Sequence, residues 1–173
     1  MKLLPILLAT VATANAGSFF QQNGNGLVEF VYPGRNVGPE VPGENPMHFC
    51  ADPSGDLAVI ESVNLLPNPP VPGATLKIDA TGLLKETIAE GAMVDITVKY
   101  GLITLIRETL DLCENSGQVD LKCPVEAGKL ILTKSVDIPK QIPPGQYTVT
   151  ANAYTADGVP ITCLTATVKF NIG

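Results

Sequence analysis

The chain has 173 residues, of which 45% are hydrophobic, and its 11 Lys and Arg against 17 Asp and Glu give a formal net charge of −6 at pH 7. This acidity, in a chain without tryptophan, argues against a nucleic-acid partner, which would need a basic patch or an aromatic platform. It also argues against strong static adhesion to anionic membranes, so we expect any membrane contact to be transient.

The amino-terminal segment MKLLPILLATVATANA has an early lysine, Lys2, a short apolar stretch and a small-x-small ending at Ala14-Asn15-Ala16. This pattern predicts a secretory signal peptide over residues 1–16. No later apolar run approaches the roughly 18 to 20 residues that span a bilayer. We therefore expect a protein of the secretory pathway that works in the vacuolar lumen or outside the cell.

Residues 17–46 are rich in Gly, Pro and Asn and have no sustained periodicity. This composition predicts a flexible extension or a propeptide, although Leu27 to Tyr32 is a candidate edge strand. Residues 47–173 are enough for one domain with a single core.

That domain reads as all-β, because its apolar runs are rich in Val, Ile, Thr and Tyr and are separated by Pro/Gly turn signals. Only Leu83 to Ala89 has room for about one helical turn. Short strands at this spacing favour an immunoglobulin-like β-sandwich of about seven strands. The predicted strands are Leu57 to Leu65, Thr75 to Leu83, Ala92 to Gly101, Leu105 to Leu112, Lys129 to Ile138, Gly145 to Tyr154 and Ile161 to Ile172.

Four cysteines, in a secreted chain, are candidates for two disulfides. Three pairings are open, and a local bridge across the turn-rich segment between Cys113 and Cys123 plus a long Cys50–Cys163 bridge is the simplest. A zinc site is disfavoured, because the gap between Cys113 and Cys123 is not finger spacing and His48 is the sole histidine.

No motif of a common enzyme class is present: there is no Gly-x-Ser-x-Gly elbow, no phosphate-binding glycine loop and no His-Glu-x-x-His. The segment DPSGD, Asp52 to Asp56, has a calcium-loop interpretation, but the spaced ligands and closing Glu of an EF-hand are missing, which favours a Pro/Gly turn. We therefore expect no metal, no cofactor and no catalytic residues.

The segment VKYGLITLIRETLDLC, residues 98–113, begins as an alternating strand and then becomes apolar on both faces from Leu102 to Ile106. Something must cover the second apolar face. Gly101 is a candidate for a bulge that redirects these side chains. The alternatives are a ligand, or ordinary cover by the amino-terminal extension or by VDIPKQIPPG.

Several long segments carry a family resemblance: VPGENPMHFC at 41–50, GDLAVIESVNLLPNPPVPG at 55–73, VKYGLITLIRETLDLC, VDLKCPVEAGKLILTKSVDIPKQIPPGQYTVTANAYTADG at 119–158 and ITCLTATVKF at 161–170. They resemble the fungal phosphatidylglycerol/phosphatidylinositol transfer proteins of the ML lipid-recognition family, to which the Niemann-Pick type C2 sterol carriers also belong. The resemblance implies a monomeric, non-enzymatic carrier with a lipid cavity between two sheets, and the disulfides Cys50–Cys163 and Cys113–Cys123.

In such a carrier, the apolar run Leu102, Ile103, Leu105 and Ile106 suits the pocket or its mouth. By the family pattern, the entrance lies near Leu105 or Ile106 and near Ile138 and Ile142, in the loop before the sixth strand. One departure concerns the ligand. Animal sterol carriers have a further cysteine pair in the loop after the first strand, where this chain has prolines, in Leu66 to Gly73. Both a phospholipid and a sterol therefore stand as ligands. The alternative function is a secreted sandwich that binds a polysaccharide or a protein partner.

Overall fold

The computed structural model describes residues 38–113 and 123–171. The predicted signal peptide and the candidate strand at Leu27 to Tyr32 lie outside these described residues. The chain divides into two units, Met1–Arg35 and Asn36–Gly173, and the fold described below is that of the second unit.

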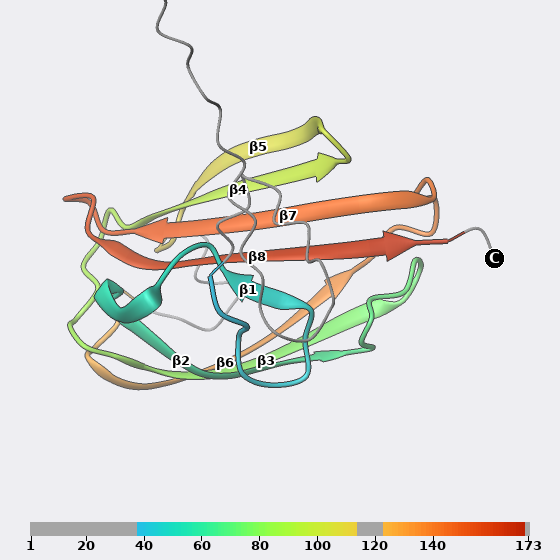
Figure 1. Ribbon diagram of the computed structural model, residues 1–173. Coiled ribbons are helices and arrows are strands. Elements are labelled where there is room, and N and C mark those ends of the chain that lie inside the picture. Colours follow the sequence, from blue (N-terminus) through green and yellow to red (C-terminus); the bar gives the residue numbers. More distant parts are fainter. Residues whose placement is uncertain (1–37, 114–122, 172–173) are drawn as a thin grey trace, which may run out of the picture. The chain divides into compact units, whose positions relative to one another are not determined.

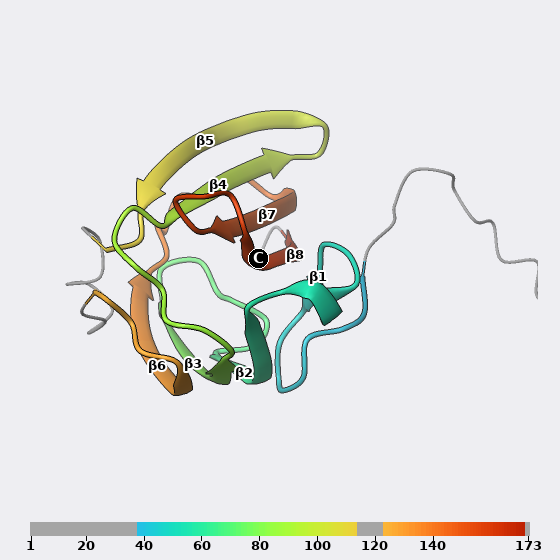
Figure 2. The ribbon, with the colours of Figure 1, turned by 90° about the vertical axis from the view of Figure 1, so that its left-hand side faces the viewer.

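Two antiparallel sheets form the domain, as predicted (Figure 1). One sheet has five strands in the order β1-β8-β7-β4-β5, and the other has three in the order β2-β3-β6. Figure 2 shows the two sheets as separate layers, with β5 and β6 on the same side. The strands are β1 (Met47–Phe49), β2 (Ala58–Leu66), β3 (Thr75–Leu84), β4 (Met93–Tyr100), β5 (Ile103–Asp111), β6 (Gly128–Asp137), β7 (Gly145–Tyr154) and β8 (Pro160–Phe170).

All seven predicted strands are present with shifts of a few residues at their ends, and β1 is an additional short strand. The helical turn proposed for Leu83 to Ala89 is wrong. Leu83 and Leu84 continue β3, and Ile88 forms a bridge with Val125 through two 2.9 Å backbone hydrogen bonds. This buried bridge gives the backbone of Ile88 its hydrogen-bond partners without a helix.

Within residues 38–113 and 123–171, the single helical element is the 3-10 turn η1 (Pro53–Gly55), which lies in the DPSGD segment. Asp52 caps it, since its side chain accepts a 3.0 Å hydrogen bond from the backbone N–H of Ser54. Lys85 donates from Nζ to the carbonyl oxygens of Ser54 and Asp56 at 3.1 and 2.6 Å. The described residues contain neither a group of three potential metal ligands nor a helix long and apolar enough to cross a membrane.

Residues 38–46 are part of the domain, which differs from the predicted boundary at Met47. Val41 is only 4% exposed and belongs to a core cluster. Asn45 holds this segment against β2, because its side-chain amide donates to the carbonyl oxygen of Val63 at 2.8 Å while its Oδ1 accepts from the N–H of Met47 at 2.7 Å. Composition suggested an extension here, but a single buried valine and a bonded asparagine are enough to dock it.

The buried residues form two clusters. One gathers Ala58, Leu84, Ile88, Ala92 and Ile161. The other gathers Val41, Phe49, Val63 and Leu65. Both rest mainly on β1, β2, β3 and β8 and on the segment between β3 and β4, so the packed core lies away from the β5 edge of the larger sheet.

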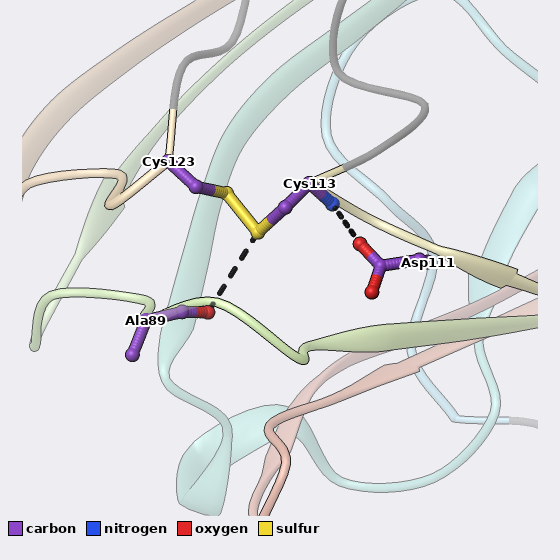
Figure 3. The surroundings of a disulfide bond; sticks show 4 residues. All are labelled: Ala89, Asp111, Cys113 and Cys123. Atoms are coloured by element: carbon purple, nitrogen blue, oxygen red, sulfur yellow. Dashed lines mark hydrogen bonds between the residues drawn. A yellow bond between two sulfur atoms is a disulfide. The ribbon is translucent and has the colours of Figure 1, made fainter.

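Both disulfides pair as the resemblance implied. Cys50 and Cys163 join the start of the domain to β8, 113 residues apart in sequence, and Cys113 and Cys123 are 10 apart. At the second bridge, the N–H of Cys113 donates to Oδ1 of Asp111 at 2.7 Å (Figure 3). Its Sγ lies 3.8 Å from the carbonyl oxygen of Ala89, which is a contact without donation, because a disulfide sulfur carries no hydrogen.

Candidate functional site

Strand register shows which side chains of the larger sheet face the smaller one. Buried Phe49 pairs with Leu164, and the row continues through Ala151 and Ile96 to Glu108. Directly opposite residues in antiparallel strands lie on the same face, so all five point inward. The next inward row runs Met47, Ala166, Val149, Val98 and Ile106.

Val149 is the most informative residue of these rows. It lies on the inward face of β7, a central strand with partners on both sides, yet it is 38% exposed. In a sandwich whose two sheets pack in contact, an inward valine of a central strand is almost fully buried. Solvent therefore reaches between the two sheets at Val149.

Other apolar side chains on inward positions of the edge strands are also exposed. Ile103 pairs with inward Tyr100 and is 64% exposed, and Ile106 is about half exposed. Across from them, Val136 of β6 is 38% exposed, although it alternates with Leu132 and Leu130 on the inward face of the smaller sheet. These side chains give the space between β5 and β6 an apolar lining.

The β4–β5 hairpin places the predicted residues differently from expectation. Gly101, with φ +55°, lies in the tight turn together with Leu102 and not in a bulge. The bulge is at Leu105, because Val98 pairs with Ile106 whereas Lys99 pairs with Thr104. This extra residue lets Ile103 and Ile106 both face inward although they are three apart in sequence.

The six predicted site residues thus fall into three settings. Ile103 and Ile106 are inward, Leu105 is the exposed bulge residue, and Leu102 is fully exposed at the hairpin tip. Ile138 and Ile142 are half-buried in the connection from β6 to β7. Val149 and Val136 were missed, because the alternation of a strand gives its two faces but does not say which inward residues the opposite sheet fails to cover.

One end of the sandwich gathers three connections, at the right of Figure 1: the β2–β3 loop, the β4–β5 tip and the β6–β7 loop. Gly73 of the first loop donates its N–H to the carbonyl oxygen of Ile138, and Gly101 of the tip donates to Gln146 at the start of β7. Exposed apolar side chains occur on this end at Leu66, Val71 and Leu102. Three large apolar side chains are thus exposed at this apolar end of the sandwich.

An aromatic cluster fixes the β6–β7 loop at this end. The Tyr100 and Tyr147 rings pack edge-to-face at 5.1 Å between centroids, and Tyr147 packs on Phe170 at 5.6 Å. The hydroxyls of Tyr100 and Tyr147 each donate 2.9 Å hydrogen bonds, to the carbonyl oxygens of Pro144 and Pro143 respectively. Desolvation, and then the nearby Tyr100, raises the pKa of Tyr147, so this phenol stays a neutral donor at neutral pH.

A pocket of about 390 Å³ lies elsewhere, beside the Cys50–Cys163 disulfide. Asp52, Asp56 and Asn152 contribute its polar groups. Desolvation raises the pKa of the Asp56 carboxyl, Lys85 opposes the rise and Asp52 adds to it. None of the inward apolar side chains near Val149 lines this pocket, so it is a separate feature.

The ML domain model matches residues 44–170, and this chain belongs to the ML domain family. Curated relatives include the phosphatidylglycerol/phosphatidylinositol transfer protein of Aspergillus fumigatus, 58% identical over 133 residues that cover 76% of each chain. The protein of the same description from Aspergillus oryzae is 50% identical over 164 residues, covering 95% of this chain and 90% of the relative.

Solved structures show the same fold at low sequence identity. A Niemann-Pick type C2 protein from the Japanese carpenter ant has a TM-score of 0.54 at 10% identity, with 71% of this chain and 98% of that chain covered. Chicken MD-1 complexed with lipid IVa has a TM-score of 0.53 at 22% identity, covering 78% and 97%. The two-sheet sandwich of this chain is therefore a fold that it shares with these solved structures.

Proposed function

We propose that this protein is a carrier that holds a phospholipid, phosphatidylglycerol or phosphatidylinositol, or a sterol between its two sheets and moves it between membranes without covalent chemistry. The observation that carries the proposal is the exposure of Val149 on the inward face of a central strand. The printed descriptions of the fungal relatives support a phospholipid ligand.

An apolar space between sheets suits such a ligand energetically. Burial of one methylene is worth about 0.8 kcal/mol, so a sixteen-carbon chain gains on the order of 10 kcal/mol. The bilayer offers the chain the same gain. A carrier must therefore match the bilayer roughly, and a site with apolar side chains on two facing sheets does so better than scattered surface leucines.

Entry and exit take place at the apolar end of the sandwich. Leu102 is fully exposed at the tip of the β4–β5 hairpin, next to inward Ile103. Leu66 and Val71 of the β2–β3 loop are exposed at the same end. Transient insertion of these side chains into the outer layer of a membrane would bring the space between β5 and β6 to the lipid.

Two disulfides fit an oxidising compartment such as the secretory pathway. We place the site of action in the vacuolar lumen or outside the cell, and the working form is a monomer whose membrane contact is transient. Size-exclusion chromatography with light scattering tests the monomer.

The proposed function is tested by organic extraction and mass spectrometry of the purified protein, followed by lipid transfer between donor and acceptor vesicles. Co-purified phospholipid or sterol and catalysed transfer are expected. A protein that carries no lipid, transfers none and is retained on cell-wall glycans would instead be the secreted binding module. That alternative has little structural support, since the described aromatic cluster is engaged with prolines and not displayed as a platform.

A further inference from the structure

Lys134 is a cation on the inward face of β6. It pairs directly with Ile78 of β3, which packs against the core cluster that contains Val63 and Leu65. The neighbouring inward positions of β6 are Leu132 and Val136. Lys134 is partly buried, and its place in the alternation puts it among apolar side chains.

No other basic side chain of the strands shares this orientation. The remaining lysines and the arginine within strands alternate with inward residues and so lie on the outer faces: Lys77, Lys99, Arg107, Lys129 and Lys169. Within residues 38–113 and 123–171, Lys134 makes no ion pair and no side-chain hydrogen bond, whereas outward Lys77 pairs with Asp79 at 2.8 Å. The Lys134 ammonium is not among the buried side-chain atoms of the described residues that lack a partner, so solvent reaches it and it is free to bind a group of a ligand.

The position of Lys134 along β6 shows which part of a bound lipid its ammonium would reach. It lies three residues before Asp137, the last residue of the strand, so it is near the apolar end with the exposed tip of Leu102. Exposed Val136 lies between it and that end. A lipid whose acyl chains lie along the apolar inward faces would hold its headgroup near this end, within reach of a flexible lysine side chain.

We propose that the Lys134 ammonium binds the phosphate of an anionic glycerophospholipid and so sets the preference of the carrier for phosphate-bearing lipids over uncharged ones. The inference rests on the proposed function. Phosphate is the matching group, because an ammonium forms charge-assisted hydrogen bonds to phosphate oxygens and a partly dehydrated site strengthens them. The hydroxyl of a sterol or a diacylglycerol offers no negative charge.

Glu108 is the charged residue on the inward face of the opposite sheet, in the row of Phe49 and Ile96. It makes no ion pair within the described part of the chain. Its negative charge repels a phosphate and so favours the orientation in which the headgroup lies on the Lys134 side. If Lys134 served only as a partner for Glu108, removal of either charge would change stability and leave lipid preference alone.

The test compares two fluorescent lipids with the same acyl chains, phosphatidylglycerol and diacylglycerol, in transfer by the full-length protein between vesicles of zwitterionic phosphatidylcholine, whose phosphate competes equally in every variant. Lys134→Met is expected to lower the ratio of the phosphatidylglycerol rate to the diacylglycerol rate about tenfold, the size of one lost charge-assisted hydrogen bond. Lys134→Arg should keep most of the ratio. Lys129→Met, which removes a lysine from the outer face of the same strand, should leave it unchanged.

Thermal midpoints of all variants are measured alongside, and Lys134→Gln replaces Lys134→Met if the latter does not fold. An unchanged ratio in folded Lys134→Met or Lys134→Gln, with both lipids still transferred, overturns the role of Lys134 but leaves the carrier intact. An equal fall in the ratio in Lys129→Met also overturns the role of Lys134, because loss of a positive charge on the outer face would then be enough to change the lipid preference. Transfer of neither lipid by the unmodified protein overturns the proposed function itself. Inhibition of phosphatidylglycerol transfer by millimolar inorganic phosphate would assign the site to free phosphate instead.

Discussion

The ring of Tyr100 lies directly against the backbone of Gly145, so closely that a β-carbon on Gly145 would collide with the ring atoms of Tyr100. Gly145 also has a φ of +148°, which side-chain-bearing residues rarely adopt. The contact joins the end of β4 to the start of β7, where Tyr100 also bonds to Pro144.

Gly145→Ala should therefore destabilise the domain by about 2 kcal/mol or more, through overpacking and backbone strain together. Chemical denaturation measures this loss. Gly55→Ala is the matched control, because a β-carbon there meets nothing within 4 Å, and its effect should stay within about 0.5 kcal/mol. Equal effects of the two substitutions would show that the contact with Tyr100 is unimportant.

Leu102→Asp tests the membrane-facing end. Because Leu102 is fully exposed, the thermal midpoint should hardly change, whereas the charge should slow vesicle-to-vesicle lipid transfer by about tenfold or more by opposing insertion. Ile131→Asp is the control: Ile131 is 68% exposed but lies on the outer face of β6. Slow transfer by both variants would mean that docking is not localised to this end.

Ile106→Asp tests the predicted pocket from inside. Ile106 faces inward yet is about half exposed, so the substitution should reduce lipid binding while the protein still folds, because an acyl chain would have to pass an unpaired carboxylate. The amount of lipid extracted from the purified variant and the thermal midpoint of that variant are measured together. Unfolding would place Ile106 in an ordinary core, and normal binding would place the ligand elsewhere.

Shortening the chain tests the domain boundary. A chain that begins at Asn36 should keep the stability of the full-length protein, since the compact unit begins there. A chain that begins at Met47 should lose about 2 kcal/mol or more, because it lacks buried Val41 and the bonds of Asn45 to Val63 and Met47. Urea denaturation compares the stabilities of the two shortened chains. Equal unfolding midpoints would show that residues 38–46 are an extension that does not stabilise the domain.

Thr162→Val should stabilise the domain. Thr162 lies on the inward face of β8 opposite Ala153, and its buried hydroxyl oxygen has no hydrogen-bond partner among the described residues. Replacing the hydroxyl by a methyl group removes that penalty, for a gain of about 1 kcal/mol. Thr165→Val is the contrast, because the Thr165 hydroxyl bonds to that of Thr150 at 3.1 Å. A loss of stability in Thr162→Val would indicate a partner for this hydroxyl, such as a bound ligand.

Local sequence determined most of the fold. Alternation of apolar and polar residues with Pro/Gly punctuation located all seven long strands, because the period of two is a property of the strand itself. The resemblance to the ML family supplied the disulfide pairing, which the structure confirms, and a predicted region for the lipid site. The short strand Met47–Phe49 escaped notice, since three residues are too few for a periodic signal.

Tertiary structure decided which face of each strand lies inside and how completely the other sheet covers it. In the segment LILTKSV, residues 130–136, the alternation places Lys134 on the same face as Leu130 and Leu132. Only the pairing of Lys134 with Ile78 identifies this face as the inward one. Likewise, nothing local distinguishes Val149 from a buried core valine. Its exposure depends on the separation of two sheets, which is set by side chains far apart in the chain. The bulge at Leu105 was also decided by tertiary structure, because an extra residue in β5 can be recognised only from the pairing of β5 with β4.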